Sequence, residues 1–414
     1  MMSSSSNKSP PTENSFWKLV HFEKTPYWLQ DNEYIRNYYR VPMSVWDSLK
    51  SALFGLHNET MNIYTHLIGF FIFVGITWFT LSFLSSLLKQ PLSLEQYIVS
   101  GTNPSLSSRL ETYSLDAWSG FLGVLLETKK FFLGFLHFSC RLASSSYSLS
   151  AASVERYWSA FQDSSLFFRS FPFTLLDASW SHKLSPDRDS FVSQVFWKVI
   201  DEHKTALLFL LTGACVCLFC STIFHMFFNV SESCFKSLSR LDYAGIVFLT
   251  MGHSLVGTYY TLYCMPELSR RYNIVISIAG LLTLGVTLYP AFDAPHNRLT
   301  RALVFVLFGT VSGLPILHAG WLHGFGHVEY MHHAQYMFIM ATFYLLGAFF
   351  FVTRLPERCS PGKFDLFFNS HNLMHICVLI AALIHWYGCM QSCIYRLHQG
   401  CALSPILSQT FLSS

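Results

Sequence analysis

The chain has 414 residues, of which 51% are hydrophobic, 17% aromatic and only 12% charged, and its mean hydropathy is positive. Soluble proteins carry about twice that share of charged residues, which excludes a soluble globular fold for most of the chain. The net charge of +3 is too small to favour a nucleic acid as partner. We therefore expect a membrane-embedded protein.

The first elements in chain order are polar. The stretch MMSSSSNKSPPTENSF has no apolar core, so no cleavable signal peptide is expected. We predict that residues 1–61 form a cytoplasmic N-terminal region with a juxtamembrane segment, and that residues 62–84 form the first transmembrane helix. A long insert loop rich in Ser and Phe follows at residues 85–205. Its segment Trp118 to Phe138 is interrupted by charges, which favours an interfacial helix over a membrane span.

Transmembrane helices two to seven are predicted within residues 206–390, and residues 391–414 form the C-terminal tail. The apolar runs are Asn62 to Leu84, Ala206 to Phe228, Tyr243 to Cys264, Ile274 to Ala291, Ala302 to Trp321, Gln335 to Val352 and His371 to Met390. The predicted fold is all-α: a polytopic membrane protein built as a seven-transmembrane-helix bundle. We expect it as an integral, multi-pass protein of the plasma membrane or an endomembrane.

The distribution of basic residues predicts the orientation of the bundle. Lys and Arg are concentrated in the short segments on the side of the N-terminus, which marks that side as cytoplasmic. With seven spans, the C-terminal tail is then non-cytoplasmic. This is the reverse of a G-protein-coupled receptor, so no conventional G protein is expected as partner. The sequons at Asn58 and Asn229 fall on the cytoplasmic side and should carry no glycan.

The cysteines do not resemble a secreted disulfide framework. The cysteines that lie well inside predicted spans are interpreted as small buried hydrophobic residues: Cys215, Cys217, Cys220 and Cys377. Only Cys389, Cys393 and Cys401 lie close enough together along the chain for pairing to be expected.

Polar residues of four predicted helices converge on one membrane depth near the cytoplasm. Helix two ends with Ser221 and His225, four residues apart and therefore on one face. Helix three begins with Asp242, and helix seven begins with His371 and His375, again four residues apart. Helix one adds Glu59, Asn62 and His66 at the same depth.

Three imidazoles from two helices suit a catalytic zinc ion, which takes three protein ligands and keeps a fourth position for water. We predict His225, His371 and His375 as metal ligands. Asp242 is then placed to take a proton from that water, and Ser221 to hold a ligand by a hydrogen bond. The alternative is a set of interfacial histidines bonded to backbone carbonyls. Glu59, Asn62 and His66 are interpreted first as a polar cap that ties helix one to its neighbours.

Other histidines are weaker candidates. His318, His323, His327, His332 and His333 form a His-rich segment between helices five and six, on the opposite side of the membrane from the predicted zinc site. Such a segment either binds a metal or is simply solvated surface. His253 is interpreted as a packing residue. His385 lies about 15 Å beyond His375 along the helix and cannot share its ion.

The motifs ETMNIYTHLIG, STIFH, RLDYAG and RLPERCSPGKFDLFFNSHNLMH resemble the progestin and adipoQ receptor family. That family includes adiponectin receptors, plant-type heptahelical proteins and hemolysin III-related proteins. The resemblance covers Pro26 to Leu84 and Ala206 to Met390. It implies zinc held by His225, His371 and His375, with Asp242 and Ser221 beside the zinc-bound water. The long insert is a departure, because it is longer than expected for the family's first loop.

The resemblance implies three functions. The first is an adiponectin-receptor-like membrane receptor that hydrolyses a ceramide-like lipid amide and is linked to lipid, hormone or stress signalling, because alkaline ceramidases share the pattern. The second is a signalling receptor without turnover, whose zinc is structural. The third, which the intramembrane histidines alone favour, is a transporter or a regulator of zinc or sterol homeostasis. Expected partners are a membrane lipid, ceramide-like or a sterol, an extracellular or luminal ligand, and a second copy of the chain.

Overall fold

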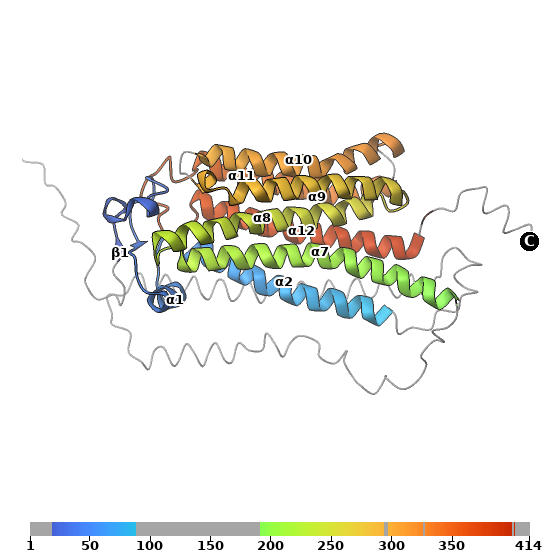
Figure 1. The fold of residues 1–414 in the computed structure, drawn as a ribbon, viewed down its shortest axis with the longest axis horizontal. Helices are drawn as coiled ribbons and strands as arrows, with labels where there is room; N and C mark the ends of the chain where they lie inside the picture. Colours follow the sequence, from blue (N-terminus) through green and yellow to red (C-terminus); the bar gives the residue numbers. More distant parts are fainter. Residues whose placement is uncertain (1–18, 88–190, 294–296, 326–327, 400, 402–414) are drawn as a thin grey trace, which may run out of the picture.

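The computed structural model describes residues 19–87, 191–293, 297–325, 328–399 and 401. Seven long helices lie side by side in a bundle (Figure 1). They are α2 (Thr60–Leu87), α7 (Phe191–Phe227), α8 (Glu232–Thr261), α9 (Pro266–Leu288), α10 (Arg298–His323), α11 (Val328–Thr353) and α12 (Ser370–Gln399). A short 3-10 helix, η5 (Pro290–Asp293), follows α9. The predicted all-α fold is confirmed.

The segment before α2 packs against one end of the bundle, at the left in Figure 1. Strand β1 (Leu19–Val20) pairs antiparallel with β2 (Tyr39–Arg40), with Leu19 opposite Arg40. Between them lie the 3-10 helices η1 (Phe22–Lys24) and η2 (Tyr27–Leu29), and helix α1 (Val45–Phe54) follows. The same end of the bundle contains the last turn of α7 and the first turn of α12.

Each long helix extends beyond its predicted apolar run at one end or both, and three do so most. Helix α7 begins at Phe191, within the range 85–205 assigned to the insert, α8 begins at Glu232, well before Tyr243, and α12 continues to Gln399, beyond Met390. The added turns of α12 contain Arg396, whose guanidinium lies over the ring of Tyr263. A hydropathy window does not detect these turns, because a charged residue lowers the mean hydropathy even where packing holds it in the helix. The rest of the insert, including Trp118 to Phe138, lies outside the described residues.

Six of the seven helices are long and apolar enough to cross a membrane by length and composition, and α8 is the exception within the part of the chain that the structure describes. Helix α8 packs against α7, α9, α10, α11 and α12. Most of α8 is covered by these helices, although Phe248 is 45% exposed, so it tolerates Ser, Thr, His and Gly at its buried positions. The predicted third helix is therefore present, although its hydropathy is low.

Helices α7 and α8 approach each other closely through glycine. A Cβ atom added to Gly213 of α7 would lie 2.6 Å from the carbonyl oxygen of Phe248 on α8, and one added to Gly252 of α8 would overlap the carbonyl oxygen of Phe209. The two backbones therefore touch, as small residues allow at helix interfaces in membranes. The main apolar core lies between this pair, α2 and α12.

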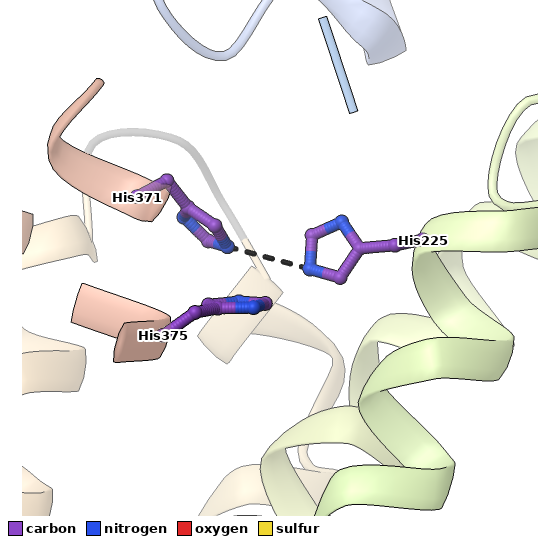
Figure 2. A group of neighbouring side chains, drawn as sticks. All are labelled: His225, His371 and His375. Carbon is purple, nitrogen blue, oxygen red and sulfur yellow. Dashed lines mark hydrogen bonds between the residues drawn. The ribbon is translucent and has the colours of Figure 1, made fainter. Parts of the chain in front are cut away.

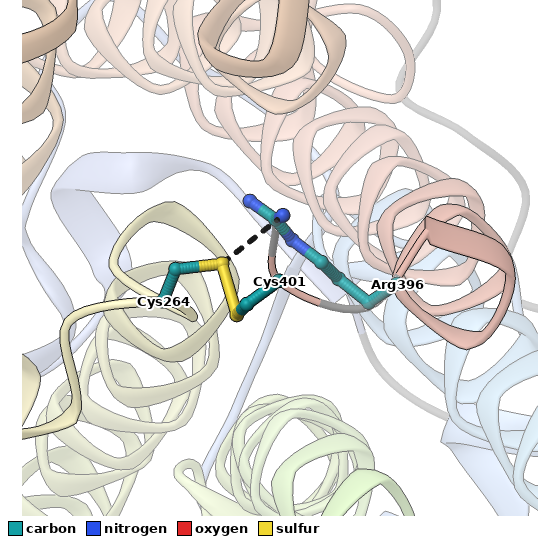
Figure 3. Close-up of a disulfide and its surroundings, with 3 residues drawn as sticks. All are labelled: Cys264, Arg396 and Cys401. Carbon is teal, nitrogen blue, oxygen red and sulfur yellow. Dashed lines mark hydrogen bonds between the residues drawn. A yellow bond between two sulfur atoms is a disulfide. The ribbon is translucent and has the colours of Figure 1, made fainter. Parts of the chain in front are cut away.

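A disulfide closes the other end of the bundle (Figure 3). It joins Cys264, after α8, to Cys401, after α12, with their Cα atoms 5.5 Å apart. The expectation that Cys401 pairs with Cys389 or Cys393 is wrong, because those two thiols are buried and free inside α12. Residues far apart in the sequence meet here only because α8 and α12 end side by side. Disulfides persist in oxidising compartments, which favours a non-cytoplasmic location for this end.

We predict that Gly213→Ala destabilises the bundle by about 1–3 kcal/mol, because the new methyl group must push α8 away from α7. Thermal unfolding of the detergent-purified protein measures the effect. Gly285→Ala is the matched control, since a Cβ atom at Gly285 meets nothing within 4 Å. Equal melting temperatures for the two variants would show that the close contact does not exist.

We also predict that Cys359, an exposed free cysteine between α11 and α12, faces the cytoplasm. After digitonin opens only the plasma membrane, an impermeant maleimide should label Cys359, and Cys359→Ser should abolish this labelling. A cysteine introduced by Arg270→Cys, at the other end of the bundle, should react in intact cells or only after full solubilisation. The reverse pattern would invert the orientation.

Candidate metal centre

Three histidines from two helices face one another at the end of the bundle where the N-terminal segment packs (Figure 2). His225 comes from the last turn of α7, and His371 and His375 come from the first turns of α12. The Nε2 atoms of His225 and His371 are 3.4 Å apart. One ring nitrogen from each of the three residues lies within 4.8 Å of those of the other two. The structure thus brings together all three residues predicted as ligands.

The spacing of these nitrogens fits a metal ion. Two nitrogens bound to tetrahedral zinc at about 2.0–2.1 Å are about 3.4 Å apart, which matches the His225 to His371 separation. His225 and His375 are almost fully buried, at 3% and 2% exposure. Neutral imidazoles are the form that ligates zinc, and no fourth His, Cys, Asp or Glu joins the group among the described residues. The donor set can therefore hold an ion with one open position.

Glu59, directly before α2, fixes the ring of His225. Its Oε2 atom lies 2.8 Å from Nδ1 of His225 and accepts a hydrogen bond from the amide of Asn62 at 2.7 Å. Burial raises the pKa of the Glu59 carboxyl, but the hydrogen bonds from His225 and Asn62 outweigh burial and lower it to about 2. An ionised carboxylate at Nδ1 leaves Nε2 as the ligand nitrogen, the arrangement common around zinc-bound histidines.

Arg40 of β2 holds the end of α7. Its guanidinium is 1% exposed and donates to the carbonyl oxygens of His225, at 2.5 Å, and Met226, at 3.0 Å. Burial lowers the pKa of Arg40 to about 10, so the side chain stays cationic at neutral pH. A positive charge at the C-terminus of a helix satisfies carbonyls that have no partner within the helix. The position of His225 thus depends on a residue outside the membrane spans.

Glu357 stabilises the start of α12, as Arg40 stabilises the end of α7. This carboxylate is fully buried, accepts a hydrogen bond from the backbone N–H of Ser370 at 2.7 Å, and also contacts the Ser370 hydroxyl. The amide of Asn32 donates to the same carboxylate at 3.0 Å. Negative charge at a helix N-terminus is favourable. Because Ser370 directly precedes His371, Glu357 fixes the first turn that presents the ligand.

Asp242 and Ser221 lie next to the three histidines. Asp242, in the third turn of α8, is close enough to interact with both His225 and Ser221. Ser221, one turn before His225 on α7, is 1% exposed. A carboxylate and a hydroxyl that face each other therefore border the nitrogens without occupying them.

The predicted cap residues of helix one lie around the same centre. The ring of His66 stacks on that of His375, with 3.7 Å between centroids, and neither of its nitrogens has a hydrogen-bond partner. Asn62 accepts a hydrogen bond from the amide of Asn372 at 2.6 Å. These residues tie α2 to α12, as the polar-cap interpretation expects, while Glu59 also reaches the ligand His225.

The His-rich segment does not assemble into a second group of this kind among the described residues. His318 pairs with the hydroxyl of Tyr272 at 2.9 Å, and His333 with that of Ser392 at 2.7 Å. His327 and the side chain of His332 are not among the parts of the chain that the structure describes. The two sequon asparagines, Asn58 and Asn229, are buried, which by itself prevents glycan attachment in the folded protein.

Arg40 and Glu357 are the site residues that sequence reasoning missed. In the sequence, Arg40 is only one of the basic residues on the predicted cytoplasmic side, and Glu357 is a residue of the motif RLPERCSPGKFDLFFNSHNLMH with no role of its own. The only available signal was their position in conspicuous polar motifs, YYR and RLPER, next to predicted spans.

A bundle of long apolar helices with a histidine cluster near one end defines a polytopic helical membrane protein with a candidate intramembrane metal centre. The profile of the family described as Haemolysin-III related matches residues 176–386, which include all three histidines. The chain belongs to this family. The match ends before the last turns of α12.

Named relatives extend the similarity over nearly the whole chain. The sequence is 29% identical to Heptahelical transmembrane protein 4 of Arabidopsis thaliana over 390 residues, 93% of this chain and 91% of that protein. It is 30% identical to Heptahelical transmembrane protein 5 of the same plant over 375 residues, 89% of each protein. It is 25% identical to the Adiponectin receptor protein of Drosophila melanogaster over 395 residues, 95% of this chain and 64% of the receptor.

We predict that Glu59→Ala weakens metal binding on the order of 10–100-fold, because the His225 ring loses the partner that orients it. Competition between the purified protein and a zinc chelator measures this affinity. Glu267→Ala removes an exposed carboxylate at the start of α9 and should leave the affinity unchanged. Equal affinities for both variants would show that Glu59 does not support the site.

Proposed function

We propose that this adiponectin-receptor-like protein is a zinc-dependent hydrolase of a membrane lipid amide, with a ceramide-like lipid as substrate. One observation carries the proposal: three histidine donors gather at the site, and a carboxylate and a hydroxyl stand beside them. Structural zinc sites are usually closed by four protein ligands, whereas catalytic sites keep one position open.

Zinc bound by the three histidines would polarise the amide carbonyl and supply a nucleophilic water at neutral pH. Asp242 is positioned near His225 to take a proton and return it to the leaving amine. The Ser221 hydroxyl, buried beside Asp242, would hydrogen-bond the substrate or the attacking group. Products would be a sphingoid base and a fatty acid.

The location of the site favours a lipid. His371 and His375 lie in the first turns of a membrane-crossing helix, and His225 lies in the last turn of another. The donors are thus near one edge of the apolar layer, where an amide linkage between a polar headgroup and acyl chains would reside. A membrane lipid is accordingly the proposed partner, with an extracellular or luminal ligand and a second copy of the chain as further partners to be sought.

A signalling receptor with structural zinc is the second candidate. It is favoured by the clamps from Arg40 and Glu357, which link the ends of α7 and α12 to the N-terminal segment. In such a receptor the metal would pin α7 to α12, and Asp242 would be dispensable. A role in zinc or sterol homeostasis would use the same donors without hydrolysis.

We predict that Asp242→Asn keeps zinc bound but lowers fatty-acid release from ceramide by about 10²–10⁴-fold, because the amide cannot accept the proton. Metal content and product release should be measured on the same detergent-purified samples. Asp201→Asn, an exposed carboxylate at the far end of α7, is the control and should retain wild-type activity.

Two other results would change the proposed function. Undiminished release in Asp242→Asn would remove this aspartate from the mechanism. Stoichiometric zinc without any release by the wild-type protein would leave the structural-zinc receptor as the function of the site.

A further inference from the structure

A second pair of buried imidazoles lies in the opposite half of the bundle. His253 of α8 and His385 of α12 are 4% and 0% exposed, and their ring centroids are 4.4 Å apart at an angle of 78°. Ring pairs within the first cluster are 4.7–5.1 Å apart at angles of 48–70°. The His253–His385 pair is thus comparable in geometry to the ring pairs of the first cluster. It is a separate site, because His385 lies about 15 Å beyond His375 along α12, too far to share an ion.

Three of the four ring nitrogens of this pair have no protein partner. Both ring nitrogens of His385 and Nε2 of His253 are buried without a hydrogen bond. A buried polar atom without a hydrogen bond raises the free energy of the folded protein. A ligand bound between the two rings would satisfy these nitrogens. Nδ1 of His253 lies 3.2 Å from the hydroxyl of Tyr344. When Nδ1 donates to that oxygen, Nε2 is left as a free ligand atom, as Glu59 leaves Nε2 of His225.

One soft sulfur donor lies beside the pair. A Cβ atom added at Gly257 of α8 would lie 3.7 Å from Nε2 of His385 and 3.5 Å from Sδ of Met337. The glycine therefore leaves a small space bordered by an imidazole nitrogen and a thioether sulfur, and Met337 is itself 3% exposed. Two further free thiols, Cys389 and Cys393, follow His385 one and two turns along α12.

The charge of the surrounding side chains determines which metal ion this pair can bind. The ring and hydrogen-bond contacts of the two imidazoles are with each other and with Tyr344, and within the described part of the chain no carboxylate contacts either ring. The cost of burying an ion rises with the square of its charge, so an uncompensated divalent ion is disfavoured here. Imidazole and thioether donors without a carboxylate suit monovalent copper. We propose that His253, His385 and Met337 form a second intramembrane site that binds Cu(I), independent of the lipid hydrolysis proposed above.

Competition with bicinchoninate tests the proposal. The full-length detergent-purified protein is titrated with Cu(I) under argon with ascorbate, and bound copper is counted after gel filtration. We expect one tightly bound copper per chain in the wild type and in His371→Ala/His375→Ala, and none in His253→Gln/His385→Gln. Tyr344→Phe should weaken binding on the order of tenfold or more, because His253 loses the group that orients it.

Milder variants keep the test decisive if the double histidine variant does not fold. Met337→Leu preserves the side-chain volume, and Gly257→Ala fills the space at ordinary contact distances, so both should fold and bind copper more weakly. X-ray absorption should show nitrogen and sulfur around the copper. Unchanged copper in these variants, or copper lost only in Cys389→Ser/Cys393→Ser, would overturn the site.

Discussion

The hydrogen bond between Glu59 and His225 joins three parts of the molecule that the metal centre requires. It links the segment before α2 to the last turn of α7, and it points the remaining nitrogen of His225 at His371. In a medium of low polarity an imidazole that could rotate would find some other partner and the cluster would be lost. A fixed carboxylate prevents this rotation, and the apolar core between α2, α7, α8 and α12 holds the helices that bring the two side chains together.

The N-terminal segment therefore acts as part of the site, although it lies outside the spans. Arg40 and Glu357 stabilise the two helix ends that carry ligands, one through carbonyls and the other through an N–H. Ion pairs from Asp31 to Arg298 and from Glu33 to Arg354 attach the same segment to α10 and to the turn after α11. Each contact at a helix end satisfies backbone groups that would otherwise be exposed at the edge of the membrane.

Sequence was sufficient for the bundle and for the three histidines because both depend on local spacing: apolar runs of membrane length, and imidazoles four residues apart. It was insufficient where a contact depends on how distant segments fold back. The spacing of the cysteines does not indicate that Cys401 pairs with Cys264. The sequence also does not distinguish a buried arginine such as Arg40 from an exposed one. Glu59 was interpreted only as part of a cap because its approach to His225 requires the relative rotation of α2 and α7, which periodicity does not define.

The polar character of α8 has a consequence for how the protein enters the membrane. A helix with buried Ser, Thr, His and Gly gains little by leaving water for lipid alone, and its glycine contacts become favourable only beside α7. Biogenesis would then require α7 and α8 to leave the translocon as a hairpin. The apolar runs of the sequence include Tyr243 to Cys264 and give seven spans. A stricter criterion of length and composition omits α8 within the described residues and finds six, which would place both termini on one side of the membrane and reverse the assigned side of every later loop.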